Sequence, residues 1–216
     1  MGLTPFKPAF SRKQSSLYMW PTTQVKKLVY AEAISLDPSA AGAIAAYVFR
    51  VNQMYDPNVS GTGHQPQGYD TLAAAYGRYN VLSAKIFIDA GPNTAPTTTY
   101  VTGIAVRDYN STSTLFGAGG YYTHIIEHGS TNWKHYANDL SQKVKLSYAC
   151  NPMKFNNSSM TQNEVAFGNN FPTDPVYFYW WMQNAGGGSQ DLPAFYGTVR
   201  IEYLVRVMDP IEQADN

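Results

Sequence analysis

The chain has 216 residues, no formal net charge, 14% charged residues, 14% aromatic residues including 17 tyrosines, and one cysteine. A chain of this length can bury roughly 70% of its unfolded surface, so its core can be stable without a disulfide or a structural metal. The lone Cys150 excludes an intrachain disulfide. No apolar run approaches the roughly 18 residues that a membrane-spanning helix needs, so no membrane partner is expected.

Residues 1–23 are predicted to form an N-terminal arm, because they are rich in proline, serine and lysine and lack the apolar run of a signal peptide. Five basic residues precede the first acidic residue of the chain: Lys7, Arg12, Lys13, Lys26 and Lys27. Two interpretations stay open, a solvated tail and a basic segment that faces a polyanion. Five charges would give weak, salt-sensitive nucleic-acid binding.

Strand patterns then recur along the chain. Alternating apolar residues, or runs of β-branched and aromatic residues, predict seven strands and a further one at 163–167. The seven segments are 24–36, 44–52, 80–89, 97–108, 141–150, 176–183 and 195–208. The segment 176–183 is almost wholly aromatic, which is typical of a central strand that is covered on both faces.

Helix is scarce. Residues 71–79 are predicted to form a short helix with Asp70 as its N-cap, since apolar residues recur there at spacings of four and three. These residues are Leu72, Tyr76 and Tyr79. A second short helix is expected between Ala118 and Ala137.

The predicted fold class is all-β. Long connections near 53–79, 109–139 and 151–175 alternate with short ones, which favours a Greek-key jelly roll over an up-and-down barrel. The Cys-Trp-Cys spacing of an immunoglobulin sandwich is absent. We therefore predict one eight-stranded jelly roll over 24–208, preceded by the arm and followed by a short acidic tail over 209–216.

The sequence contains no convincing catalytic set. The pattern His124–His128 matches H-x-x-E-H, but flanking glycines leave room for only about two helical turns, so a connecting segment is favoured over a zinc site. Aspartates at predicted strand and helix ends could bind Ca²⁺, but turns and caps explain them more simply. No nucleophile elbow, P-loop or dinucleotide fingerprint occurs. We expect no catalytic residues, no metal and no cofactor.

The most distinctive stretch runs from Tyr55 to Tyr79. It contains Tyr55-Asp56-Pro57, then Gly63-His64-Gln65-Pro66, then Gly68 and Asp70, and finally Tyr76, Arg78 and Tyr79. This segment, with the strand before it, resembles the C–D connector in capsid proteins of circular, Rep-encoding single-stranded DNA viruses (circovirus-like). Those proteins are similar to the shell domains of tombusvirus-type RNA viruses.

The resemblance implies a jelly roll of two four-stranded sheets, with short helices in the C–D and E–F connections. It implies a structural capsid protein that assembles with itself, as about 60 copies or a multiple, into an icosahedral shell around viral nucleic acid. Single-stranded DNA is the expected genome, the virion the expected location, and the host nucleus or cytoplasm the place of assembly.

Within this resemblance, His64 and Asp56 are expected to be structural, with the His64 ring fixing a turn through backbone hydrogen bonds. Arg78 is expected beside Tyr76 and Tyr79 as a structural or interface residue. The long arginine-rich arm that is usual in the family is not present here. The alternative function is a jelly-roll carbohydrate-binding module.

Overall fold

The computed structural model describes residues 20–38, 43–117, 119–186 and 190–211. The strands in this part of the chain are β1 Thr23–Leu36, β2 Ala45–Arg50, β3 Tyr76–Pro92, β4 Tyr100–Arg107, β5 Thr131–Tyr136, β6 Val144–Cys150, β7 Glu164–Ala166, β8 Tyr177–Asn184 and β9 Phe195–Pro210. The helices are α1 Tyr69–Ala75, α2 Thr112–Phe116, α3 Tyr122–Glu127, α4 Pro152–Phe155 and the short 3₁₀ helix η1 Thr161–Asn163.

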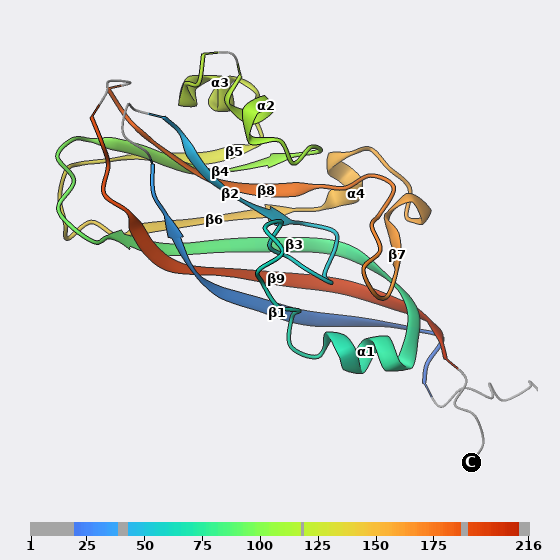
Figure 1. Ribbon diagram of the computed structural model, residues 1–216. Helices are drawn as coiled ribbons and strands as arrows, with labels where there is room; N and C mark the ends of the chain where they lie inside the picture. The colour runs from blue at the N-terminus through green and yellow to red at the C-terminus, as the bar shows by residue number, and fades with distance from the viewer. Residues whose placement is uncertain (1–19, 39–42, 118, 187–189, 212–216) are drawn as a thin grey trace, which may run out of the picture.

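The strands form two antiparallel sheets. One has the order β1-β9-β3-β6, with β7 paired to one end of β3, and the other has the order β2-β8-β4-β5. Each order joins strands that are distant in sequence, as the Greek-key connections of a jelly roll require. The prediction of an all-β jelly roll is therefore confirmed, and β7 adds a fifth strand to one of the two expected four-stranded sheets (Figure 1).

The main core lies between the two sheets, and strand periodicity explains it. Along β9 every second side chain from Val199 to Val207 is buried, while the residues between them face away from the core. Each fully buried large apolar side chain contributes about 1.5–3 kcal/mol. The long alternating run at the end of the sequence therefore becomes a central strand of the first sheet.

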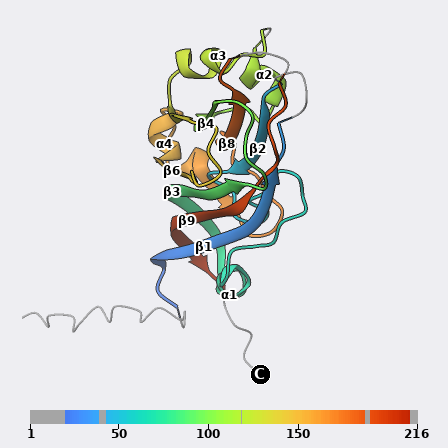
Figure 2. The same cartoon turned by 90° about the vertical axis from the view of Figure 1, so that its left-hand side faces the viewer.

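Strand β8 is buried on both faces, as its sequence predicts. Phe178, Trp180 and Met182 point into the main core. The alternate residues Tyr177, Tyr179 and Trp181 belong to a second apolar cluster with Leu115 of α2 and Ile125 of α3. The connection between β4 and β5 thus covers the outer face of the second sheet. Figure 2 shows α2 and α3 above this sheet, with the first sheet below it.

The predicted helix at 71–79 is wrong in its second half. Helix α1 ends at Ala75, and Tyr76 is extended, with φ −136° and ψ 144°, at the start of β3. The segment from Tyr76 onward pairs with β9, and the rings of Tyr76 and Tyr79 are buried. Long-range strand pairing and aromatic burial outweigh the helical spacing, and aromatic residues also favour strands. Asp70 is not the N-cap, because Gly68 occupies that position with φ 87°.

The eighth strand of the sandwich is also not the predicted one. The segment at 163–167 forms only the three-residue β7, which lies off the path of the sheet. The eighth strand is β5, which no strand pattern in the sequence predicts, and it follows α3, the short helix expected between Ala118 and Ala137. Its sequence, Thr-Asn-Trp-Lys-His-Tyr, is largely polar, and its residues are half-buried or exposed, because β5 is an edge strand that pairs only with β4 in the described chain. An edge strand without an apolar face carries little period-2 signal.

The predicted limits of the jelly roll differ slightly from the observed strands. Strand β1 begins one residue before the predicted start at 24, and β9 extends two residues beyond the predicted end at 208. Most of the predicted arm, with Lys7, Arg12 and Lys13, lies outside the described residues, as does the end of the tail. Among the described helices, none has the length and apolar character needed to cross a membrane.

Candidate functional site

The connection between β2 and β3 is fastened to the edge strand β1 through His64. The Nδ1 atom of His64 lies 2.7 Å from the carbonyl oxygen of Gln65, and Nε2 lies 2.9 Å from the carbonyl oxygen of Ala31 on β1. The ring also packs against Tyr30, with centroids 4.9 Å apart. The ring contacts the backbone in the way that the sequence predicts.

Both ring nitrogens of His64 face acceptors, so both can donate only when the ring is protonated. The backbone hydrogen bonds to Gln65 and Ala31, and then the charge of Glu32, raise the pKa of His64 above its ordinary value, while partial burial acts against them. A raised folded-state pKa gives stabilisation that is complete below the ordinary histidine pKa of about 6.5 and is lost as the pH rises through the raised value.

We expect His64→Ala to lower the melting temperature most in mildly acidic buffer, with the difference from wild type shrinking as the pH rises beyond the folded-state pKa. Thermal unfolding followed across about pH 5 to 9 measures this, a range that brackets the histidine titration. The control is His135→Ala, an exposed histidine on β5 whose described contacts are the rings of Tyr122 and Trp133. A His64→Ala difference that stays constant with pH would contradict the assignment.

Side chains of β1 also contact the connection between β2 and β3. Asn58 donates from Nδ2 to Glu32 at 2.9 Å, and the hydroxyl of Tyr30 donates to the same carboxylate at 2.5 Å. Gly63 has to lack a side chain here, because a Cβ would lie 2.7 Å from the Tyr30 hydroxyl oxygen. The glycine of the Gly63-His64-Gln65-Pro66 motif therefore allows the connector to approach β1 closely.

The remaining motif residues have structural contacts as well. Asp56 forms an ion pair with Arg50 at 3.7 Å. The carbonyl of Pro57 accepts from the amide of Arg50 at 2.8 Å, next to an isolated β-bridge between Asn58 and Phe49. Gln65, with its amide oriented to satisfy both groups, donates to Asp70 at 2.8 Å. Pro66 is buried, and its carbonyl accepts from the amide of Tyr69 at 3.0 Å.

An aromatic cluster links α1, β3 and the segment after β7. Tyr69 lies edge-on to Tyr55 and to Phe167, with centroids 6.1 Å and 5.2 Å away. The Tyr79 hydroxyl accepts from the amide of Met54 at 3.1 Å. Tyr76 donates from its hydroxyl to the carbonyl of Pro21 at 3.2 Å. These ring contacts and hydrogen bonds hold the connector in place.

Arg78 is not held by its tyrosine neighbours, which corrects the expectation from the sequence. Its side chain points outward and forms ion pairs with Glu164 of β7, at 2.7 Å, and with Asp209 near the end of β9. Asp209 has φ 59°, in the left-handed region. Arg78 therefore links β3, β7 and β9 at the end of the sheet where β1 begins and β9 ends.

The H-x-x-E-H segment does not form a metal site in the described residues. His124 and His128 lie on and just after α3, with rings 4.4 Å apart, and no described cluster of three or more His, Cys, Asp or Glu side chains could hold a metal ion. Cys150 is buried, and burial raises the pKa of its thiol to about 12, so the thiol is a core residue rather than a nucleophile.

The outer face of the β1-β9-β3-β6 sheet differs from that of the other sheet because no described helix packs across its central part. Strand register places Lys27, Glu202, Lys85 and Arg200 on this face together with Phe87, Asp89 and Lys145. Four of these side chains are basic and two are acidic, so this part of the face is positive although the whole chain has no net charge. Lys27 was a predicted nucleic-acid contact, and it pairs with Glu202 at 2.8 Å. Lys26, the next predicted contact, is exposed on the same strand.

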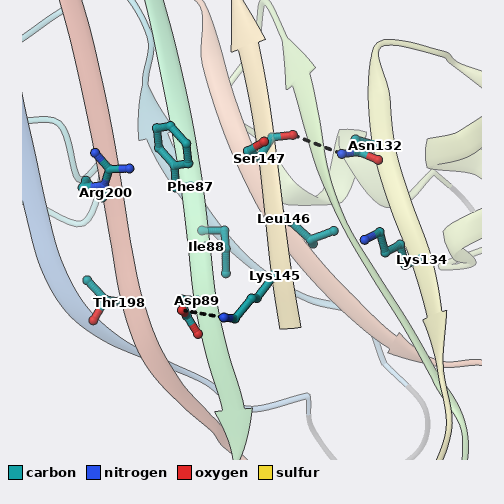
Figure 3. A pocket seen from close by; sticks show the side chains of 10 residues that line it. All are labelled: Phe87, Ile88, Asp89, Asn132, Lys134, Lys145, Leu146, Ser147, Thr198 and Arg200. Atoms are coloured by element: carbon teal, nitrogen blue, oxygen red, sulfur yellow. Dashed lines mark hydrogen bonds and ion pairs between the residues drawn. The ribbon is translucent and has the colours of Figure 1, made fainter. Parts of the chain in front are cut away.

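A cleft of about 740 Å³ opens beside this positive face, between β3, β6 and β9 of one sheet and β5 of the other. Figure 3 shows Lys134, Lys145 and Arg200 among its lining residues, with Phe87 on β3. Asn132 of β5 donates to the carbonyl of Ser147 at 3.0 Å, which joins the two sheets along the cleft. The sequence analysis missed this site, because its residues come from four strands that only the fold brings together.

No protein-family model matches the chain, and no curated protein matches it. Among solved structures, a chain from the semi-empty virus-like particle of giant freshwater prawn Macrobrachium rosenbergii nodavirus is similar, with a TM-score of 0.52, 8% identity, and coverage of 99% of this chain and 97% of that one. Chains from mud crab tombus-like virus (TM-score 0.47, 9% identity, coverage 99% and 94%) and turnip yellow mosaic virus (TM-score 0.44, 13% identity, coverage 100% and 90%) also match. Together with the two sheet orders, the similarity to the nodavirus chain shows that the chain has a jelly-roll fold of viral capsid type.

Proposed function

We propose that this protein is the capsid subunit of a small icosahedral virus and that its role is structural rather than enzymatic. The observation that carries the proposal is the pair of sheet orders β1-β9-β3-β6 and β2-β8-β4-β5, combined with the motif-bearing connector between β2 and β3. The similarity to the nodavirus particle supports it by analogy of fold. Fold alone does not specify function, so assembly has to be measured.

The surface chemistry is suited to repeated contact between copies. Charged residues make up only 14% of the chain, and large apolar side chains are exposed at several places, among them Trp133, Tyr121, Phe171 and Tyr196. Aromatic enrichment with few charges is typical of the buried centre of a protein interface. A closed shell uses the same few contacts many times.

We infer that the shell encloses nucleic acid, and the resemblance of the connector favours single-stranded DNA. The basic residues of the arm, Lys7, Arg12 and Lys13, and the two exposed lysines at the start of β1, Lys26 and Lys27, are proposed to face it. We also propose that the predicted arm 1–23, apart from Thr23 of β1, and the predicted tail 209–216, apart from Asp209 and Pro210 of β9, lie outside the shell-forming domain. The virion is the proposed location.

Electron microscopy of the purified full chain tests the proposal. We expect closed particles of uniform diameter with about 60 copies or a multiple, as closed point-group symmetry requires. A protein that remains monomeric at high concentration would overturn it. Digestion of the particle contents with DNase, RNase and a single-strand-specific nuclease identifies the packaged strand. Sensitivity to RNase alone would overturn the assignment of single-stranded DNA and leave the capsid function intact.

The carbohydrate-binding alternative gains no support from the aromatic run on β8. Its residues from Tyr177 to Met182 are buried between the main core and the helices α2 and α3, so their rings are not available to stack on a sugar.

A further inference from the structure

The cleft between β5 and the β1-β9-β3-β6 sheet is lined by more positive than negative charge. Lys134, Lys145 and Arg200 are its basic residues, and Asp89 is its one acid among the described lining residues. Asp89 lies 3.9 Å from Lys145, and both side chains are more than 60% exposed. Exposed pairs of this kind contribute little to stability, so an incoming anion can replace Asp89 as the partner of Lys145.

The other cations of this face are also only partly neutralised. Arg200 shares the carboxylate of Glu202 with Lys27, so one acid serves two bases. Within the described part of the chain, no carboxylate lies within ion-pair distance of Lys85 or Lys134. Several cations therefore remain available on the cleft and the sheet beside it, which is the electrostatic arrangement that binds a polyanion.

Phe87 gives the cleft a second property. The guanidinium of Arg200 lies over its ring at 4.1 Å, and the ammonium of Lys85 lies 4.8 Å from the ring centroid. A guanidinium held over an aromatic ring is planar, always charged, and able both to donate to phosphate and to stack on a base. Aromatic rings with basic neighbours are the usual platform for single-stranded nucleic acid.

The cleft is also fixed in shape by the fold. The hydrogen bond from Asn132 to Ser147 holds β5 against β6, and β4 carries β5 on its other side. Lys134 on β5 and Arg200 on β9 therefore lie on opposite sides of the lining residues, with β3 and β6 between them (Figure 3). A volume of about 740 Å³ is within the range of pre-formed ligand clefts.

We propose that this cleft binds single-stranded nucleic acid, with Lys134, Lys145 and Arg200 contacting successive phosphates and the Arg200–Phe87 pair supporting a base. The proposal rests on the proposed function, and it places the genome on the uncovered face of the β1-β9-β3-β6 sheet. The proposal therefore assigns contact with the nucleic acid to residues of folded strands as well as to the basic arm.

The test uses the full chain and the variant K134Q/K145Q/R200Q. Binding of a fluorescent oligothymidylate of about 20 nucleotides is followed by anisotropy as a function of salt, a length that exceeds the site of a typical single-strand module. Each lost phosphate contact lowers the salt slope by about 0.7, so the triple variant should lose about 2 from the slope and bind about 100-fold more weakly near 0.1 M salt.

Two variants serve as controls. Lys154→Gln removes one exposed base on α4, away from the cleft, and should leave the salt slope unchanged. K26Q/K27Q removes the two bases predicted from the sequence on β1. If K26Q/K27Q weakens binding of the oligonucleotide while K134Q/K145Q/R200Q binds it like wild type, the cleft proposal is overturned.

Particle formation separates this proposal from the proposed function. We expect the triple variant to form particles of normal diameter that contain less nucleic acid, measured by the ratio of absorbance at 260 and 280 nm, which reports nucleic acid against protein. Normal particles with normal nucleic-acid content would overturn the cleft proposal and leave the capsid function intact. Folded variant protein that fails to form particles would assign the cleft to a contact between subunits instead, and would also overturn the proposal.

Discussion

Gly197→Ala is expected to destabilise the subunit severely. Gly197 lies on β9 opposite Ala90 of β3, and an added Cβ would lie 2.5 Å from both Cα and Cβ of Ala90 and nearer still to the carbonyl oxygen of Asp89. The clash is with backbone, so rotation of a side chain cannot relieve it. Overpacking of this kind costs about 3 kcal/mol or more, and for a domain of this size the melting temperature should fall by roughly 6–12 °C.

Gly91→Ala is the matched control, because Gly91 is the next residue of β3 and also pairs with β9. A Cβ there would meet its nearest neighbour, Cγ of Lys143, at 4.0 Å, which is ordinary contact. We expect a change within about 0.5 kcal/mol. Thermal unfolding of both variants, with particle yield by electron microscopy, decides the outcome. An equal fall in melting temperature for the two variants would show that the close approach of β3 and β9 at Gly197 does not cause the destabilisation.

Asn52→Ala is expected to cost about 3 kcal/mol, since each buried polar group that loses its partner costs about 1–3 kcal/mol. Asn52 is 1% exposed and follows β2. It donates to Oδ1 of Asn163 at 2.9 Å and to the carbonyl of Asp174 at 2.8 Å, and accepts from the amide of Val176 at 2.9 Å. Truncation removes all three bonds and leaves the connection before β8 without its internal anchor.

Chemical unfolding in urea measures this loss as a shift of the midpoint without a change of slope. The control is Asn156→Ala, which removes one hydrogen bond of 3.2 Å to the same carbonyl of Asp174 from a partly exposed side chain. We expect that variant to lose about 0.5–1.5 kcal/mol. An Asn52→Ala variant as stable as the control would mean that water replaces Asn52 within the connection.

The strands with strong local patterns were predictable from the sequence. The inward residues of β9, such as Val205, and the doubly buried β8 follow from side-chain alternation and from aromatic content, which are properties of a segment itself. The role of His64 as a backbone anchor also followed from its place among glycine and proline. These features depend on few distant partners, so local reasoning was sufficient for them.

Other features depend on which segments pair, and the sequence does not show that directly. Tyr76 and Tyr79 fit a helical spacing, yet pairing with β9 draws them into β3. The polar strand β5 forms because β4 offers it an edge, not because its own residues alternate. Arg78 forms ion pairs with Glu164 and Asp209, which are distant from it in the sequence.

The sequence by itself determined an all-β jelly roll with a distinctive connector, because side-chain periodicity and turn residues are local properties. Tertiary structure alone decided the cleft, because Phe87, Lys134, Lys145 and Arg200 come from four strands. Their juxtaposition is set by strand order and register, and a one-residue slip in register would turn these side chains to the other face of the sheet. The positive face of a neutral chain therefore arises from the fold and not from composition.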